Sequence, residues 1–410
     1  MEGIHFFGAL LPERTFLFIG GYTMKLIKIS FIFIILFTMF VGLGRTFFFP
    51  TDINLYENRY AEKVTTPTLT AVEDHIFQDS IEDALADQIP YAQDIKRAYN
   101  ISTSAYLDSI LSPILRNING SYVPYNSLYI FGEDQLVFPP MKLDELTPSL
   151  DKKATSLNKT FKKHSDIEFF IYYIEKDTDI DFETKKKLGA REYLFDKIDL
   201  PKTNLACYEI NDYDTFRAYF YKTDHHWNNK GSYTAYTDLL KFLNVPEEPL
   251  QPIEEVSIDY FSGAKAATVG ATNFTEEFVA YKFDFPTMSV SIDGVPVADY
   301  GQEDAFYTDA YFDELSYGGF YGADNGEVAI STGNSEKENI LLIGDSFDNA
   351  IIKLLATHYN NTYAVDLRNY EHFNGQPFDF SGYIEKNEID KVLIIGNIDY
   401  FVMDTFNLEN

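Results

Sequence analysis

Apolar and polar residues alternate in blocks along the C-terminal quarter of the chain. Apolar runs at 339–344, 362–367 and 391–397 have the length and composition of buried strands, and the segments 347–358 and 380–388 between them carry helical signals. Strands that are apolar on both faces and connected by helices are typical of parallel sheets covered on both sides. The pattern therefore predicts an α/β fold with a parallel sheet.

The middle of the chain contains further elements of the same kind. The periodicity predicts helices at 146–164 and 231–243 and strands at 167–174 and 205–210. Residues 245–338 differ, because they are rich in Gly, Asp and Tyr and contain only short alternating runs. Asp293-Gly294 is a hairpin-turn pair within them. We expect residues 245–338 to be a β-rich insertion that forms a wall of the cleft in which a ligand would bind.

A long apolar stretch lies near the N-terminus. Residues 29–43 are almost wholly apolar, Phe47-Phe48-Phe49 extend them, and Lys25 and Lys28 precede them. About 20 apolar residues span a bilayer, and flanking cations stay on the cytoplasmic side. We therefore predict a single-pass membrane helix with the main domain outside the cytoplasm. A cleaved signal peptide is the alternative, since Gly42-Leu43-Gly44 has the small residues of a cleavage site.

These patterns predict a division of the chain into successive parts. Met24 resembles a natural start, so the residues before it are a candidate upstream extension. The region after the apolar stretch is polar, and helical spacing begins at Ile76, Ile81 and Leu85. The expected parts are an extension at 1–23, a membrane anchor or signal peptide at 24–49, a stalk with a helical segment at 50–112, and the α/β domain at 113–410.

Composition narrows the class of protein. A hydrophobic content of 45% and an aromatic content of 16% allow a large core and exclude global disorder. The net charge is −30, and no Lys/Arg-rich patch follows the first residues, which argues against a nucleic-acid partner. Cys207 is the only cysteine, so neither an intrachain disulfide nor a cysteine-based metal site can form. The aromatic content also suits a glycan-binding cleft.

The segment Ile340–Phe347 carries the first chemical signal. Its apolar run breaks at Gly344 and places Ser346 on a strand-to-helix turn. There, the N–H groups and the positive dipole end of the following helix can stabilise an oxyanion. The alternative is structural, because Asp345 or Ser346 would also serve as a cap for the helix.

The second signal is the string Thr223–Lys230, which contains Asp224, His225, His226 and Trp227. Residues two apart in an extended segment project to the same side, so the Asp224 carboxylate can orient the His226 imidazole as a base for Ser346. A salt-bridged loop histidine and a metal site at the two histidines are the alternatives, but no third ligand has a recognisable spacing. We expect His225 to be structural or to contact substrate, and Trp227 to pack behind the loop or stack on a sugar.

Two residues at strand ends are further candidates. Asn397 ends the strand at 391–397, at the same sheet edge as Ser346, where ligands gather in open α/β sheets. It is either an oxyanion donor or a turn former. Arg368 follows the strand at 362–367 and either steers an acidic substrate or pairs with Asp366.

These residues resemble a known family. Thr223-Asp224-His225-His226-Trp227-Asn228, with Lys230-Gly231-Ser232-Tyr233, is similar to the signature of the bacterial DHHW family, which resembles the SGNH hydrolase-like acetyltransferases of alginate O-acetylation. Blocks that fall in the expected order are Glu57-Asn58-Arg59, Asp87-Gln88-Ile89-Pro90, Gly344-Asp345-Ser346-Phe347 and Val365-Asp366-Leu367-Arg368. The resemblance covers about residue 55 onward. It implies an SGNH-like three-layer α/β/α domain with a triad of Ser346, His226 and Asp224.

The resemblance implies a function in the cell envelope. The expected activity is O-acetyl transfer to a polysaccharide through an acylated Ser346, without a cofactor or metal. A single membrane helix cannot carry acetyl groups across a bilayer, so this activity requires a multi-span membrane protein as acetyl donor. A carbohydrate acetylesterase of the same fold and a non-catalytic glycan-binding envelope protein are the alternatives.

Overall fold

The computed structural model describes the backbone of residues 13–50, 53–54, 59–60, 63–64, 66–68, 72, 76–89, 95, 98–99, 102–103, 121–269, 274–301, 317–322, 324–403 and 408. The chain divides into two compact units, Met1–Tyr99 and Asn100–Asn410. The boundary predicted between residues 112 and 113 falls outside the described residues.

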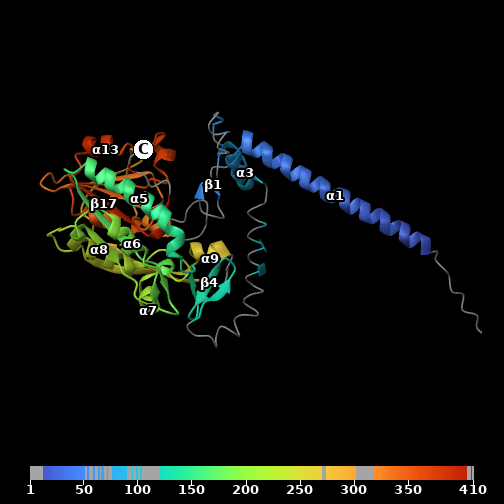
Figure 1. Ribbon diagram of the computed structural model, residues 1–410, viewed down its shortest axis with the longest axis horizontal. Helices are drawn as coiled ribbons and strands as arrows, with labels where there is room; N and C mark the ends of the chain where they lie inside the picture. The colour runs from blue at the N-terminus through green and yellow to red at the C-terminus, as the bar shows by residue number, and fades with distance from the viewer. Residues whose placement is uncertain are drawn as a thin grey trace, which may run out of the picture. The chain divides into compact units, whose positions relative to one another are not determined.

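The first unit contains a long apolar helix, α1 (Glu13–Phe48) (Figure 1). Its segment Lys28–Phe48 has 21 residues and a mean hydropathy of 2.1, which makes it long and apolar enough to cross a membrane. The side chains of this segment are mostly exposed. The unit also contains the antiparallel pair β1 (Ile53–Asn54) and β2 (Arg59–Tyr60) and the helix α3 (Ile76–Gln88) that the spacing predicted.

The second unit is built around an eight-stranded sheet with the strand order β13-β12-β14-β16-β15-β17-β6-β9. In chain order its strands are β6 (Glu168–Ile174), β9 (Leu205–Tyr208), β12 (Ser289–Ile292), β13 (Val295–Val297), β14 (Glu327–Ser331), β15 (Asn339–Ile343), β16 (Asn361–Val365) and β17 (Lys391–Gly396). The parallel arrangement predicted from the sequence holds for β16, β15, β17, β6 and β9.

The insertion makes the sheet mixed rather than wholly parallel. Strands β14, β12 and β13 come from residues 245–338 and extend the sheet in antiparallel pairs beyond β16. Between β12 and β13, Asp293 and Gly294 have φ angles of 48° and 76°, so the predicted hairpin turn forms where both residues adopt left-handed conformations. The predicted β-rich character of the insertion is therefore seen, but three of its strands belong to the main sheet.

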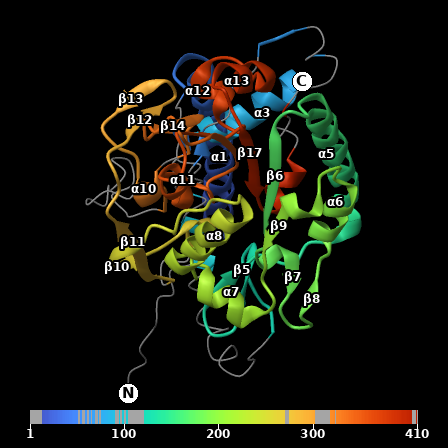
Figure 2. The ribbon, with the colours of Figure 1, turned by 90° about the vertical axis from the view of Figure 1, so that its left-hand side faces the viewer.

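Helices cover both faces of the sheet (Figure 2). Alternate side chains of each central strand enter two separate cores; in β6, for example, Phe170 and Tyr172 enter one and Phe169 and Ile171 the other. The first core includes residues of α8 (Asn229–Phe242) and α11 (Asn349–Ala356). The second includes residues of α5 (Leu143–Lys163), α6 (Ala190–Lys197), α13 (Phe380–Lys386) and α14 (Ile398–Val402).

The remaining elements lie outside this sheet. They are the three-stranded sheet β3 (Val123–Tyr125), β4 (Leu128–Phe131) and β5 (Gln135–Val137), the pairs β7 (Ile180–Asp181) with β8 (Lys186–Lys187) and β10 (Pro252–Phe261) with β11 (Glu276–Phe283), and the helices α7 (Tyr213–Tyr219), α9 (Ala264–Val269), α10 (Tyr317–Tyr321) and α12 (Tyr370–Asn374). The parallel strands β15, β16 and β17 end at one edge of the main sheet, which places Ser346, Arg368 and Asn397 in the same region.

Candidate functional site

The loop between α7 and α8 folds back on itself and presents Asp224 and His226. A backbone bridge joins Phe220 to Trp227, and the Tyr221 N–H donates to the His226 carbonyl oxygen at 3.1 Å. Asn228 then starts α8, because its side-chain oxygen accepts hydrogen bonds from the first backbone N–H groups of the helix. The two ends of the loop are therefore fixed, and its short polar tip has a defined conformation.

Asp224 is buried and accepts hydrogen bonds on both carboxylate oxygens. Oδ1 accepts from the His226 backbone N–H at 3.0 Å and lies 2.6 Å from His226 Nδ1, while Oδ2 accepts from the Ala264 N–H at 2.7 Å. The backbone can approach this closely because residue 263 is glycine; a Cβ there would lie 2.4 Å from the Asp224 Cβ. The Asp224 carboxylate thus has a fixed orientation toward the imidazole.

The charge on Asp224 is stabilised despite its burial. Burial alone would raise the pKa of this carboxyl group. The charges of His226 and His225, with the hydrogen bonds from His226 and Ala264, outweigh burial and lower the pKa well below its usual value. An ionised carboxylate only accepts hydrogen bonds, so His226 Nδ1 carries the proton and Nε2 is left free to accept one.

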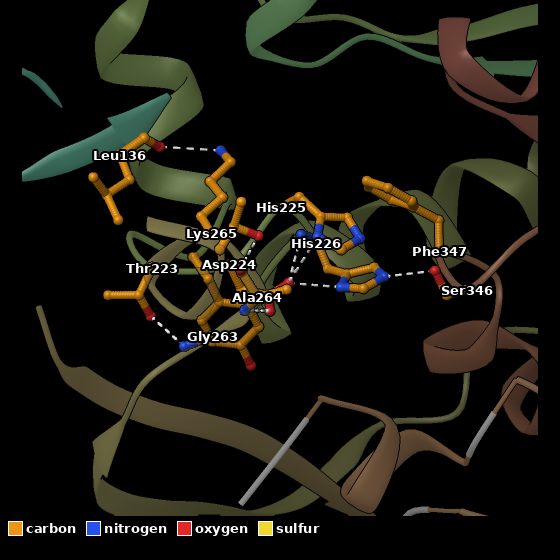
Figure 3. A network of polar contacts seen from close by, with 12 residues as sticks. Leu136, Thr223, Asp224, His225, His226, Gly263, Ala264, Lys265, Ser346 and Phe347 are labelled. Carbon is orange, nitrogen blue, oxygen red and sulfur yellow. Dashed lines mark hydrogen bonds and ion pairs between the residues drawn. The ribbon is translucent and has the colours of Figure 1, made fainter. Parts of the chain in front are cut away.

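Ser346 lies opposite Nε2 of His226, on the turn between β15 and α11. The Ser346 Oγ is 2.8 Å from His226 Nε2, although 120 positions separate the two residues (Figure 3). Ser346 is half-buried, and α11 begins only at Asn349, so a turn separates the serine from the helix that was predicted to start at residue 347. The predicted convergence of Asp224, His226 and Ser346 is thus a feature of the structure.

The turn that carries Ser346 is held by a neighbouring strand. Asp345 Oδ1 accepts from the Phe347 N–H at 3.0 Å, and Asp345 Oδ2 accepts from the Asn397 side-chain amide at 3.3 Å. Gly344 is required before it, because a Cβ at this position would lie 2.2 Å from Asp348 Oδ2. Glycine at this position therefore leaves room for the Asp348 carboxylate.

The other candidate residues occupy structural positions around these three. Asn397 caps α14 by accepting the Asp399 N–H at 2.9 Å and directs its amide at Asp345. Arg368 pairs with Asp366, with Nε 2.9 Å from Asp366 Oδ1, so the pairing alternative describes its position. Trp227 is fully buried against Tyr208 and Phe347, and its ring offers no face for a sugar to stack on.

His225 is partly exposed, and its ring centroid lies 4.0 Å from that of His226. Burial, together with the charge of His226, lowers the pKa of His225 well below its usual value, so this imidazole is neutral at physiological pH. Of the residues that the structure describes, only Asp224, His225 and His226 bring three metal-ligand atoms within 4.8 Å of one another. A metal ion there would have to displace Asp224 or Ser346 from a ring nitrogen of His226, because both nitrogens already have partners.

Glu276 of β11 is a site residue that the sequence did not reveal. Its carboxylate accepts hydrogen bonds from the Lys222 N–H at 2.9 Å, the Thr223 N–H at 2.7 Å and the Thr223 hydroxyl at 2.7 Å. The Thr223 hydroxyl in turn accepts from the Gly263 N–H at 3.0 Å. Glu276 therefore fixes the backbone immediately before Asp224. Glu276 lies 53 positions downstream of Thr223 in an ordinary strand-like run, so no local pattern identifies it.

We expect Glu276→Gln to lower both stability and any activity of the site. The amide group would place N–H donors against the donors that Glu276 now accepts, and a hydrogen bond to a charged group contributes about 1.5–3 kcal/mol. The expected result is a loss of about 1–3 kcal/mol in the free energy of unfolding, measured by urea denaturation. Glu277→Gln is the matched control, because Glu277 is adjacent and exposed. Equal stability of the two variants would show that Glu276 does not hold the loop.

Comparisons with known proteins agree with the motif and the fold. A family model described as DHHW protein matches residues 149–365. A solved DHHW family protein from Eubacterium siraeum is 19% identical, with a TM-score of 0.55 over 69% of this chain and 95% of that one. Bacillus cereus PatB1, in a structure with a sulfonyl adduct, is 20% identical, with a TM-score of 0.52 over 68% of this chain and 98% of that one.

A third solved structure has a lower TM-score. The O-acetyltransferase domain of Pseudomonas putida AlgJ is 10% identical, with a TM-score of 0.37 over 69% of this chain and 93% of that one. No curated protein sequence matches the chain.

Proposed function

The chain belongs to the DHHW family, and we propose that it transfers acyl groups to the hydroxyl groups of a cell-envelope polysaccharide, with Ser346 as the nucleophile. One observation carries this proposal. His226 contacts the Ser346 hydroxyl at 2.8 Å with one ring nitrogen and the buried Asp224 carboxylate at 2.6 Å with the other. This is the arrangement in which an imidazole takes the proton of a serine hydroxyl while a carboxylate fixes its tautomer.

The proposed first half-reaction acylates the enzyme. Ser346 Oγ attacks the carbonyl carbon of the acyl donor as His226 Nε2 takes the hydroxyl proton. The resulting tetrahedral intermediate collapses when the imidazolium returns this proton to the leaving group of the donor. The acyl group is then bound to Ser346 Oγ as an ester, and His226 is neutral again.

The proposed second half-reaction transfers the acyl group to the polysaccharide. A sugar hydroxyl attacks the ester carbonyl while His226 Nε2 takes its proton, and the imidazolium then protonates Ser346 Oγ as it leaves. Both steps pass through an oxyanion. Among the described residues no acceptor bonds to the backbone N–H of Ser346, and we assign this N–H to the oxyanion. The dipole of α11 favours negative charge on the same side.

The proposed setting is the outer side of a membrane. Helix α1 supports single-pass anchoring, and Lys25 and Lys28 before its apolar part favour a cytoplasmic N-terminal end. The second unit would then face the envelope, where a polysaccharide is the acceptor. The acyl donor would be supplied by a multi-span membrane protein, since one helix offers no path for an acetyl group.

We expect the full-length chain to acetylate an oligosaccharide from a chromogenic acetyl ester. Transfer and hydrolysis share the acyl-Ser346 intermediate and differ in whether a sugar hydroxyl or water attacks it. The measurement is mass spectrometry of the oligosaccharide after incubation with the ester, with Ser346→Ala as the control. Release of acetate without acetylated sugar would indicate an esterase. If the wild-type chain and Ser346→Ala release the chromophore equally slowly, a glycan-binding protein without catalysis becomes the better description.

A further inference from the structure

An aromatic ring covers one face of the His226 imidazole. Tyr317, the first residue of α10, lies parallel to it, with ring centroids 3.8 Å apart and an angle of 3° between the planes. The ring of the adjacent His225 also lies close, at a centroid distance of 4.0 Å, but it is tilted by 36° to the imidazole. Tyr317 therefore stacks on a face of the imidazole, while the two nitrogens at the edge of the ring contact Asp224 and Ser346.

The position of Tyr317 is fixed by the helix that follows the nucleophile. Tyr317 is buried and contacts Tyr321 on the next turn of α10, with centroids 4.8 Å apart. The chain directly after α10 is attached to α11, because the Asn349 side-chain amide donates to the Gly322 carbonyl at 3.1 Å. The Tyr300 hydroxyl bonds to the same Asn349 side chain at 3.3 Å. Asn349, the first residue of α11, therefore anchors the end of the helix that begins with Tyr317.

We propose that Tyr317 is a positioning residue for the proposed acyl transfer, which holds the His226 ring in the plane of Asp224 and Ser346 and stabilises the imidazolium formed during the reaction. The first effect follows from the parallel contact, because rotation of the imidazole about its bond to Cβ would drive it into the Tyr317 ring. The second follows from the negative face of an aromatic ring, which attracts a cation placed over it.

Charged groups of the described residues also act on His226 and on its partner Asp224. Asp224 on the same loop contacts the edge of the imidazole at Nδ1, and Asp345 on the nucleophile turn interacts electrostatically with His226. Lys265 of α9 acts on Asp224 and pairs with Asp177 at 2.6 Å.

Two substitutions of Tyr317 distinguish an effect of its aromatic face from an effect of merely filling the space beside His226. Tyr317→Phe keeps the ring and loses only the hydroxyl, whereas Tyr317→Leu keeps an apolar cover without an aromatic face. We expect Tyr317→Leu to lower kcat/KM for a chromogenic ester about tenfold and to shift the acid limb of its pH profile to lower pH by about one unit. The shift has this sign because losing an interaction that favours the charged imidazole lowers its pKa. Tyr317→Phe should retain at least about half of the activity.

The experiment uses the full-length chain in detergent and a second readout that needs no activity. The pKa of His226 is measured by NMR titration of histidine labelled at Cε1, with His226→Asn to assign the signal. Phe320→Leu is the matched control, because Phe320 lies on α10 and packs against Phe278 at a centroid distance of 5.7 Å. It should leave the His226 pKa unchanged.

The possible outcomes distinguish this inference from the proposed function. A lower His226 pKa in Tyr317→Leu, with a wild-type value in Tyr317→Phe, supports the positioning role even if the wild-type chain turns over no ester. An unchanged His226 pKa in Tyr317→Leu would overturn it, even if the wild-type chain is an active transferase. Equal pKa shifts in the Leu and Phe variants would overturn it as well, because the effect would then belong to the hydroxyl group.

Discussion

Replacing Ser346 with alanine is expected to lower turnover of an acetyl ester by on the order of 10⁴- to 10⁶-fold, because removal of a triad member has effects of this size in serine hydrolases. The substitution removes one oxygen from a half-buried position on a turn and leaves Asp345, which holds the turn, in place. The fold should therefore be retained. Initial rates with a chromogenic ester measure the activity, and circular dichroism measures the melting temperature.

A covalent probe tests the same prediction without a known substrate. A sulfonyl fluoride is a suitable reagent, because it reacts with an activated serine hydroxyl. Intact-mass analysis should show one adduct on the wild-type chain and none on Ser346→Ala. Ser381 provides the matched control, since its hydroxyl lies 3.1 Å from the His164 Nε2. Ser381→Ala should react like the wild type, and an adduct that persists in Ser346→Ala would exclude Ser346 as the nucleophile.

The sequence predicted the central sheet because its strands are locally unambiguous. The runs at 339–344 and 391–397 are apolar except at their end residues Asn339, Lys391 and Asn397, and the structure places β15 and β17 there with both faces covered. The antiparallel strands of the insertion could not be predicted in the same way. Whether β14 pairs beside β16 depends on the path of the chain through residues 245–338, and local hydrophobicity does not encode that path.

The same difference between local patterns and tertiary packing applies to the residues of the candidate site. Asp224 and His226 are two residues apart, and Ser346 follows a strand and a glycine, so local patterns mark all three residues, although the contact between His226 and Ser346 is made by tertiary packing. Glu276 and Tyr317 lie in the insertion and reach the site only through tertiary packing. The sequence correctly predicted the sheet edge at which Asn397 lies. It did not predict that Asn397 caps α14 and contacts Asp345, because both contacts depend on the tertiary structure.

The hydrogen bonds of Asp224 give its replacement by asparagine a large expected effect. The carboxylate accepts from His226 on Oδ1 and from the Ala264 N–H on Oδ2. The asparagine side chain has one oxygen that accepts hydrogen bonds and one NH₂ group that donates them. If its oxygen faces His226, its NH₂ group opposes the Ala264 N–H. If its NH₂ group faces His226, Nδ1 must give up its proton, and Nε2 then carries one and cannot accept the Ser346 proton.

We therefore expect Asp224→Asn to lower kcat for the ester by about 10⁴-fold, the size expected when a triad histidine is held in the wrong tautomer. The measurement is kcat at neutral pH with the same chromogenic ester. Asp379→Asn is a suitable control, because Asp379 caps α13 and asparagine is an equally good cap. A loss below about tenfold in Asp224→Asn would mean that Asp224 does not set the tautomer of His226.

The pH dependence of stability provides an independent check on the same carboxylate. The charges of His226 and His225 lower the pKa of Asp224 relative to the unfolded chain, where an Asp titrates near pH 4. Its ionised form therefore contributes stability that is fully present above about pH 4 and is lost as the pH falls toward the lower pKa of the folded state. The difference in melting temperature between the wild type and Asp224→Asn should accordingly be largest near neutral pH and shrink in acid. A difference that is constant from neutral pH to about pH 2 would mean that the carboxylate is not stabilised by the histidine charges, and the tautomer argument would lose its electrostatic basis.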